Sequence, residues 1–372
     1  MKRILFVLHE ATRTGSPIAL LHFLKWIKQN NPHVTIDVLV LNDGALSVEF
    51  YNLSDNFYDY RQLLKAEKFN LLERLLIKFK VLKKSNPKER LLSVLNENNY
   101  DLIYANSIPS LDIAASLIKQ SKSTKFLLHV LELEIVLKMH IDKTDNSLHL
   151  VDKFIAASGI VKTNLAENWG VDEEKIEVVY PFSKNPDKTL KKQSKHFIIG
   201  ASGTVESRKG TDAFLQVARL VNKNIPNANI EFVWVGKNDN DYFVQSDVEK
   251  MKLSKKVTFT GEQENPHDFF KEFDVFLMTS REEPFGIVCA EAANLKKPIV
   301  CFEGVTGIQE ILVNGGGYIV PYLDVEQMAE KVMFYYNNKV ELILDGEKAQ
   351  QLFSEFTPEK GCSLIYDIIN NM

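Results

Sequence analysis

Two carboxylates with a spacing that suits ligand binding stand in the stretch Glu-Pro-Phe-Gly-Ile-Val-Cys-Ala-Glu, from Glu283 to Glu291. Eight residues of helix span about 12 Å, comparable with the distance from a sugar ring across a pyrophosphate to a ribose. Both carboxylates could accept hydrogen bonds from hydroxyl groups, and the amides around 285–287 could bind phosphate between them. Taken singly, each glutamate could equally be an acid near a helix N-terminus or on a helix surface.

A second segment combines glycine with two adjacent cations. Gly203 follows a predicted strand, and Arg208-Lys209-Gly210 comes just before a predicted helix. Glycine lets a backbone approach a ligand closely, and the cations and the helix N-terminus would all attract phosphate. The alternative is a surface loop whose Arg and Lys face water, and it stays open for the segment taken alone.

Histidines are candidates at two predicted strand ends, and the cysteines point to no site. His129 closes the apolar run 126–129, and His9 follows the run 4–8. Ligands of open α/β sheets bind beyond the carboxyl ends of the strands, although either histidine could instead be a structural strand-end residue. The three cysteines form no C-x-x-C pair and no H-E-x-x-H string occurs, so we expect buried, reduced cysteines and no zinc site.

Alternating strand and helix patterns must position these residues. A chain of 372 residues suggests two domains, and the repeated β-then-α order predicts parallel sheets covered by helices. We expect domains at 1–182 and 196–372 with a Lys-rich linker at 183–195; the last helix could pack back on the first domain. Predicted strands are 4–8, 34–41, 101–105, 126–129, 154–157, 176–180, 197–200, 230–235, 257–260, 275–278 and 298–302; predicted helices are 18–27, 111–118, 158–168, 211–222, 241–252, 267–272, 286–294 and 325–336. Ser16 and Pro17 are expected to begin the first helix as N-cap and N1.

Composition excludes several function classes. The formal net charge is -4 and the pI is about 6.1, which gives no reason to propose nucleic acid as a partner. No apolar stretch approaches the ~18 residues of a membrane-spanning helix, and the apolar run at the start is too short for a signal peptide. We therefore expect a cytoplasmic protein.

The segment 61–90 departs from this acidic balance. Its ten cations and three anions sum to about +7, with apolar residues interleaved at roughly helical spacing. A basic amphipathic helix can lie on an anionic membrane surface, here the inner membrane face. The alternative is a helix that packs on the core with a solvated basic face. If Leu75, Leu76 and Phe79 are partly exposed, the membrane-surface helix is favoured. If they are buried, the helix that packs on the core is favoured.

The combination of segments resembles the retaining glycosyltransferases of family GT4, whose GT-B architecture has two Rossmann-like domains facing across a cleft. The stretch Glu283–Glu291 is similar to the E-x7-E motif of this family. The segment 203–210 is similar to its donor-phosphate loop, and 126–129 is similar to its strand that ends in an active-site histidine. Two more segments, 154–158 and 178–181, are similar to the end of its first domain. Their order covers nearly the whole chain.

The resemblance implies transfer of a sugar from a nucleotide-sugar donor, UDP-sugar rather than GDP-sugar, to a saccharide or lipid-linked acceptor in surface polysaccharide or glycolipid synthesis. Lys209, Glu283 and His129 would be catalytic, the last of these on the first domain. Arg208 and Lys209 would bind the pyrophosphate, Glu283 the sugar and Glu291 the ribose. The remaining donor contacts would come from Gly15 and from the backbone at Phe285, Gly286 and Ile287.

No metal and no cofactor is expected, because two cations and a helix N-terminus can stabilise the charge on a leaving nucleotide diphosphate. The anomeric configuration would be retained by front-face displacement, in which the departing phosphate takes the acceptor's proton. Glu132 and Glu134 lie near His129 in the sequence and are candidate nucleophiles for the alternative, a covalent intermediate; neither is assigned this role. Two other functions stay open. One is a nucleotide-sugar epimerase of the same fold, and the other is a non-catalytic, transferase-like partner protein. A dehydrogenase is disfavoured, since no G-x-G-x-x-G follows the first strand.

Overall fold

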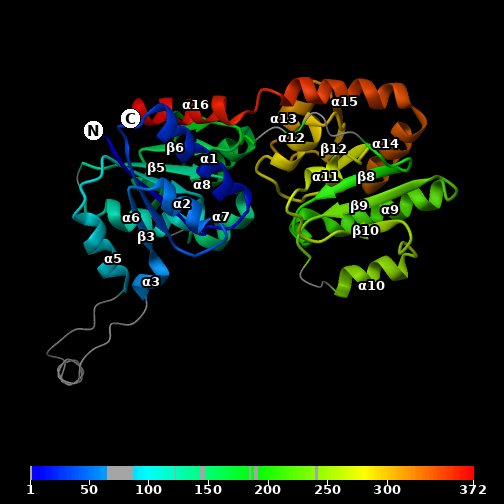
Figure 1. The fold of residues 1–372 in the computed structure, drawn as a ribbon. Helices are drawn as coiled ribbons and strands as arrows, with labels where there is room; N and C mark the ends of the chain where they lie inside the picture. The colour runs from blue at the N-terminus through cyan, green and yellow to red at the C-terminus, as the bar shows by residue number, and fades with distance from the viewer. Residues whose placement is uncertain are drawn as a thin grey trace, which may run out of the picture. The chain divides into compact units, whose positions relative to one another are not determined.

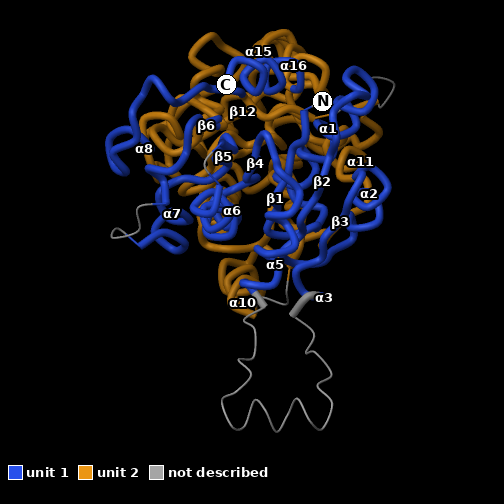
Figure 2. The backbone as a smooth tube through the Cα atoms, turned by 90° about the vertical axis from the view of Figure 1, so that its left-hand side faces the viewer, with its two compact units in different colours: residues 1–156, 165–179, 362–372 blue, residues 157–164, 180–361 orange. Residues whose placement is uncertain are grey.

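The chain forms two compact units, each built on one sheet. The computed structural model describes residues 2–64, 87–121, 123–142, 147–183, 186–187, 192–238 and 242–372. Unit 1 comprises Met1–Ala156, Leu165–Val179 and Cys362–Met372, and unit 2 comprises Ala157–Asn164 and Tyr180–Gly361 (Figure 2). The chain therefore passes between the units at four places; we predicted a boundary near residue 182 and a last helix that could pack back on the first domain.

Unit 1 (Figure 1) has a seven-stranded parallel sheet in the order β3-β2-β1-β4-β5-β6-β7. The strands from β3 to β6 can be followed in this order in Figure 2. Its central strands are short apolar runs that are buried along almost their whole length, as expected where helices cover both faces. Its elements are β1 (Arg3–Leu8), α1 (Gly15–Asn30), β2 (Thr35–Val40), α2 (Ser47–Leu53), β3 (Asn56–Asp59), α3 (Tyr60–Leu64), α5 (Pro87–Asn96), β4 (Leu102–Asn106), α6 (Leu111–Ile118), β5 (Lys125–Val130), α7 (Glu134–His140), β6 (Lys153–Ala156), α8 (Gly159–Trp169, shared with unit 2), β7 (Ile176–Val178) and α16 (Pro358–Asn370, of which Cys362 onward belongs here).

Unit 2 has a six-stranded parallel sheet in the order β10-β9-β8-β11-β12-β13. The order steps outward from β8 on both sides, which is the doubly wound pattern, and it puts β8 beside β11. Its elements are β8 (Phe197–Ser202), α9 (Thr211–Asn224), β9 (Ile230–Val235), α10 (Tyr242–Lys250), β10 (Val257–Phe259), α11 (His267–Phe270), β11 (Val275–Met278), α12 (Ile287–Asn294), β12 (Ile299–Phe302), α13 (Gln309–Leu312), β13 (Gly317–Val320), α14 (Val325–Asn337) and α15 (Lys339–Phe353).

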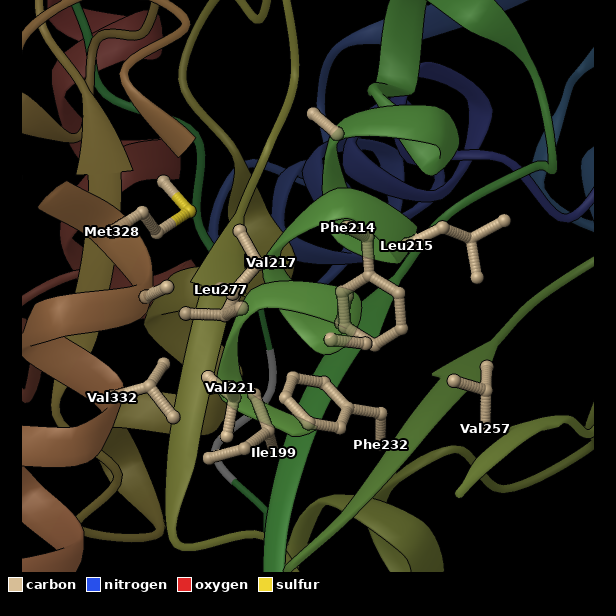
Figure 3. Packing of buried hydrophobic residues seen from close by; sticks show 14 of the residues in the cluster. Ile199, Phe214, Leu215, Val217, Val221, Phe232, Val257, Leu277, Met328 and Val332 are labelled. Carbon is tan, nitrogen blue, oxygen red and sulfur yellow. The ribbon is translucent and has the colours of Figure 1, made fainter. Parts of the chain in front are cut away.

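Alternate residues of the unit 2 strands feed two separate cores. Ile199 and Leu277 point to the face covered by α9 and α14, where they meet Val217 and Val332 (Figure 3). Their strand neighbours, Phe276 among them, point to the opposite face, which α11, α12 and α15 cover. This alternation follows from the two-residue period of a strand. Both layers are apolar, so the strand ends are held rigidly in place.

The structure confirms the predicted α/β class with two Rossmann-like units, and it corrects some element bounds. The first helix begins at Gly15, with Thr14 as the extended N-cap residue, so Ser16 is not its N-cap. The short strands β3 and β13 were not predicted; β13 begins at Gly317, after two further glycines that hide its pattern. All three cysteines are buried and free, as expected.

The membrane prediction falls mostly beyond what the structure shows. Residues 65–86 of the basic segment, including Leu75, Leu76 and Phe79, lie outside the described residues. Within the described part of the chain, no helix is both long enough and apolar enough to span a bilayer.

Candidate functional site

The candidate donor residues of unit 2 gather at the carboxyl edge of its sheet. The loop 203–210 follows β8 and the loop 279–286 follows β11, and these two strands are paired in parallel. Neighbouring parallel strands end at the same edge, so the two loops lie side by side. The backbone N–H of Arg281 donates to the carbonyl oxygen of Arg208 at 2.8 Å, which joins the loops directly.

Close approach of these loops requires glycine at position 210. Gly210 has φ +71° and is the N-cap residue of α9. A Cβ atom at this position would overlap the carbonyl oxygen of Thr279. Thr279 in turn donates its hydroxyl to the carbonyl of Lys209 at 3.1 Å. The left-handed conformation and the contact together leave no room for a side chain.

Lys209 and Glu283 form an ion pair across the two loops. Their side chains are 18% and 13% exposed, so the pair is shielded from much of the solvent that weakens surface ion pairs. The backbone of Glu283 is fixed as well: its N–H donates to Val305 at 2.8 Å, and its carbonyl accepts from Gly307. A cation and a carboxylate, predicted to bind phosphate and sugar, thus stand next to each other.

Arg208 has a different set of partners from Lys209. Its guanidinium donates to Glu206 at 2.8 Å and to the carbonyl of Glu282 at 3.1 Å. A second arginine, Arg281, was missed by the sequence analysis; it donates to the carbonyl of Ser207 and, with both terminal nitrogens, to Asp212 at 2.7–2.8 Å. The hydrogen bonds from Arg281 lower the pKa of Asp212. Three cations therefore lie at these loops. The position of Arg281, two residues before the Glu283–Glu291 stretch, was the feature of the sequence that could have revealed it.

The Glu-Pro-Phe-Gly stretch ends at a helix N-terminus. Gly286 has φ +93° and is the N-cap residue of α12, which begins at Ile287. The first N–H groups of a helix have no acceptor within it, and they favour anions. Phe285 turns its ring into the core, 1% exposed and 5.3 Å from the ring of Tyr180, so a contact with a ligand would have to come from its backbone.

Glu291 lies on α12, on the same helix whose start follows Glu283. It is 17% exposed, and its carboxylate lies 3.6 Å from Nε2 of His267 on α11. That nitrogen is buried, and no hydrogen-bond partner for it occurs among the described residues. His267 was read only as part of a predicted helix. The sequence does not show that His267 lies beside Glu291, since α11 and α12 become neighbours only when the chain folds.

His129 is deeply placed at the carboxyl end of β5 in unit 1. It is 5% exposed, and its Nδ1 lies 2.6 Å from the hydroxyl of Tyr104. Burial lowers the pKa of His129 to about 3, so the ring is neutral near pH 7. Its Nε2 is buried with no hydrogen-bond partner in the described part of the chain. This residue can orient a ligand by hydrogen bonding, and a catalytic role remains a prediction.

Gly15 and the two glutamates near His129 have separate surroundings. A Cβ atom at Gly15 would meet nothing within 4 Å, and φ is not positive there, so the fold itself does not require glycine at this helix start. The Glu134 carboxylate accepts from the indole of Trp169 at 2.7 Å and pairs with Lys138 at 2.8 Å. The Glu132 carboxylate accepts two backbone N–H groups. Both glutamates are thus engaged in protein contacts.

Among the residues that the structure describes, no group of three or more His, Cys, Asp or Glu side chains is arranged to hold a metal ion. The expectation of a metal-free reaction overlooked one D-x-D string, Asp239-Asn240-Asp241, which follows β9 and lies outside the described residues. A metal therefore has to be tested by experiment.

The segment that carries the donor residues has known relatives. Residues 183–353 match the family model Glycosyl transferases group 1. The poly(ribitol-phosphate) alpha-N-acetylglucosaminyltransferase of Staphylococcus aureus (strain COL) is 28% identical over 162 residues, which cover 42% of this chain and 32% of that protein. The capsular polysaccharide biosynthesis glycosyltransferase CapM of Staphylococcus aureus is 26% identical over 172 residues, 46% of this chain and 44% of that protein. The chain spans less than half the length of these curated relatives.

A solved structure resembles the whole fold. The crystal structure of Anabaena HepE in complex with UDP and glucose matches with a TM-score of 0.78 at 18% identity, covering 100% of both chains. This likeness shows the fold, and it confirms the predicted class of two Rossmann-like units, as in GT-B glycosyltransferases.

Proposed function

We propose that this protein is a glycosyltransferase that moves a sugar from a nucleotide-sugar donor to a saccharide or lipid-linked acceptor, in the synthesis of a surface polysaccharide or glycolipid. The observation that carries the proposal is the joined pair of loops in unit 2. They hold Lys209 beside Glu283 and place both next to the N-terminus of α12, within the region that matches group 1 glycosyl transferases.

The arrangement suits a nucleoside diphosphate with a sugar attached. The phosphates would lie against Arg208, Lys209 and the first amides of α12, which offset the negative charge that grows as the bond to the sugar breaks. The Glu283 carboxylate would accept hydrogen bonds from the sugar hydroxyls, exchanging part of its contact with Lys209. Glu291, beside His267, would accept from the ribose hydroxyls.

The donor nucleotide, the stereochemistry and the contribution of unit 1 can also be assigned. We propose UDP-sugar as donor, because the structural relative HepE is in complex with UDP and glucose. We propose retention of the anomeric configuration by front-face displacement, since Glu132 and Glu134 both have partners within unit 1. Unit 1 would be the acceptor side; it would contribute His129 through hydrogen bonding of its neutral ring, and Gly15 through the open space at the start of α1.

Product analysis tests this function. The protein is incubated with UDP-, GDP- and ADP-sugars, with and without lipid-linked and saccharide acceptors, and the products are followed by mass spectrometry and NMR. The expected result is an acceptor that gains one sugar with the donor's anomeric configuration, together with free nucleoside diphosphate. A free epimerised sugar without any acceptor product would favour the epimerase. An absence of any reaction with donors that do bind would favour the non-catalytic partner protein.

A further inference from the structure

Three consecutive carbonyl groups of the Glu-Pro-Phe stretch, those of residues 283–285, accept hydrogen bonds from outside the stretch. Taken in this order, their donors are the N–H of Gly307 at 3.3 Å, the hydroxyl of Ser158 and the hydroxyl of Thr306 at 3.1 Å. Ser158 and Thr306 are both fully buried, and all of these residues belong to unit 2. The backbone of the stretch is thus held at each of three successive peptide groups.

Holding a carbonyl group also orients the N–H group that follows it. The two belong to one planar trans peptide unit and point in opposite directions; the described part of the chain contains no cis peptide bond. The contact between Ser158 and the Pro284 carbonyl therefore turns the N–H of Phe285 away from Ser158. The contact of Thr306 turns the N–H of Gly286 in the same way. Among the described residues, neither of these N–H groups has a hydrogen-bond acceptor.

The contacts meet at a point where no side chain fits. A Cβ atom added at Gly307 would lie 2.4 Å from the carbonyl oxygen of Pro284 and 2.5 Å from the Cβ atom of Ser158. Three backbone segments therefore pack directly on one another at this glycine. They are the loop before α12, the loop before α13 and the turn before α8.

The position of Ser158 is set in turn by Glu310 on α13. Ser158 comes directly before α8. The first two N–H groups of this helix, at Gly159 and Ile160, donate to the two carboxylate oxygens of Glu310 at 2.9 and 2.8 Å. The hydroxyl of Tyr180 donates to the same carboxylate at 2.8 Å. The first N–H groups of a helix have no acceptor within it and favour an anion, so the carboxylate holds the turn that carries Ser158.

We propose that Ser158 and Glu310 are positioning residues of the donor site. Glu310 fixes the turn before α8, and Ser158 on that turn holds the Pro284 carbonyl. The N–H of Phe285 is thereby oriented, before any ligand binds, for a hydrogen bond to the diphosphate of the donor. This ligand contact rests on the proposed function. Neither Ser158 nor Glu310 has to touch the donor, because each acts through the backbone of the stretch, and donors that are already oriented need no reorganisation when charge develops.

Isotope labelling can observe this one peptide group. Only two Pro-Phe pairs occur in the chain, Pro181-Phe182 and Pro284-Phe285. The full-length protein with ¹³C-carbonyl proline and ¹⁵N-phenylalanine therefore gives one signal for each pair in a carbonyl–amide correlation NMR spectrum. Pro181→Ala removes one signal and assigns both. The Pro284-Phe285 signal reports the carbonyl that Ser158 holds together with the N–H that the donor would meet.

Without ligand, Ser158→Ala is expected to shift the Pro284-Phe285 signal, because the carbonyl loses its donor. The matched control is Ser110→Ala in unit 1, which removes an equally buried hydroxyl that donates to the carbonyl of Asn106 at 2.9 Å. It should leave the signal in place. If the two variants give the same spectrum, the role of Ser158 is refuted.

Glu310→Gln tests the other positioning residue. An amide has a single oxygen, so it cannot replace both acceptor atoms at the start of α8, and the Pro284-Phe285 signal is expected to shift here as well. Glu272→Gln is the matched control, since the Glu272 carboxylate also accepts from two consecutive N–H groups, those of Gln193 and Ser194, at 2.7–3.1 Å. A signal that stays in place in Glu310→Gln, or that moves equally in Glu272→Gln, would overturn the role of Glu310.

Titration with UDP tests what the oriented N–H group does. UDP should shift the Pro284-Phe285 signal of wild type, and Ser158→Ala and Glu310→Gln should each bind UDP about tenfold more weakly, as expected for one lost hydrogen bond to a charged group. Ser110→Ala and Glu272→Gln should bind as wild type does. If the first two variants lose stability in urea but keep the wild-type affinity for UDP, both residues are only structural and the proposal is wrong.

The same titration separates this proposal from the proposed function. UDP that binds without moving the Pro284-Phe285 signal would overturn the positioning role and leave the transferase proposal standing. A wild-type protein that binds no UDP would contradict the UDP-sugar donor and the ligand contact together. The ligand-free spectra would then still decide whether Ser158 and Glu310 orient the peptide group.

Discussion

At the scale of single residues, the account depends on Lys209 and Glu283. Both side chains are largely shielded and they pair with each other across two loops. The lysine balances the carboxylate where a negatively charged ligand would bring further charge. We propose that each member has one role in the free protein and another with donor bound, which would distinguish this pair from an ordinary surface ion pair.

We predict that Lys209→Ala and Glu283→Ala each lower turnover by about 10²–10³-fold, since that is the typical cost of removing one preorganised charge-stabilising group. Steady-state kinetics of folded variants, checked by circular dichroism, measure this. The matched controls are Lys296→Ala and Glu347→Ala, which break an ion pair of 3.1 Å whose members are 52% and 54% exposed. Near-wild-type turnover in the first two variants would exclude the assigned site.

At the scale of elements, the loops that end β8 and β11 form one structural unit because Gly210 lets them touch. We predict that Gly210→Ala lowers the free energy of unfolding by several kcal/mol, since it combines a strained left-handed residue with a backbone overlap. Gly261→Ala is the control: its φ is +74° but nothing lies within 4 Å of the added Cβ, so it should cost only ~1 kcal/mol. Urea unfolding measures the free energy of unfolding of both variants. Equal losses of this free energy would contradict the prediction, because they would mean that the loops move and relieve the overlap at position 210.

Most of the elements could be predicted from the sequence because their patterns are local. The largely apolar run 230–235, interrupted only by Glu231, and the continuous apolar run 275–278 predicted β9 and β11 residue for residue. Gly203, Arg208 and Glu283 could be placed at strand ends for the same reason. The site positions of Arg281 and His267 could not be predicted, because their partners, Asp212 and Glu291, are distant in sequence.

At the scale of the whole molecule, the net charge of -4 contrasts with the positive charge of the basic segment 61–90, whose ten cations and three anions sum to about +7. A lipid-linked acceptor would explain this segment, because each Lys or Arg near an anionic surface contributes about 1 kcal/mol.

We predict salt-sensitive binding to vesicles that contain anionic lipid and little binding to neutral vesicles, measured by co-sedimentation at low and high salt. A variant with Lys78, Lys80, Lys83 and Lys84 changed to Gln should lose this binding while keeping its turnover on a soluble acceptor. Equally weak binding to both vesicle types would remove the membrane proposal and leave the transferase proposal standing.

We propose that protein cations and a helix N-terminus, rather than a metal ion, hold the nucleotide diphosphate of the donor. The most direct test is calorimetric titration of UDP into wild type and Lys209→Ala in the presence of EDTA. The account predicts that wild type binds UDP with the chelator present and that the variant binds at least about tenfold more weakly, equivalent to ~1.4 kcal/mol. Binding that disappears with EDTA, returns with magnesium and is lost in an Asp239→Asn, Asp241→Asn double variant would contradict it.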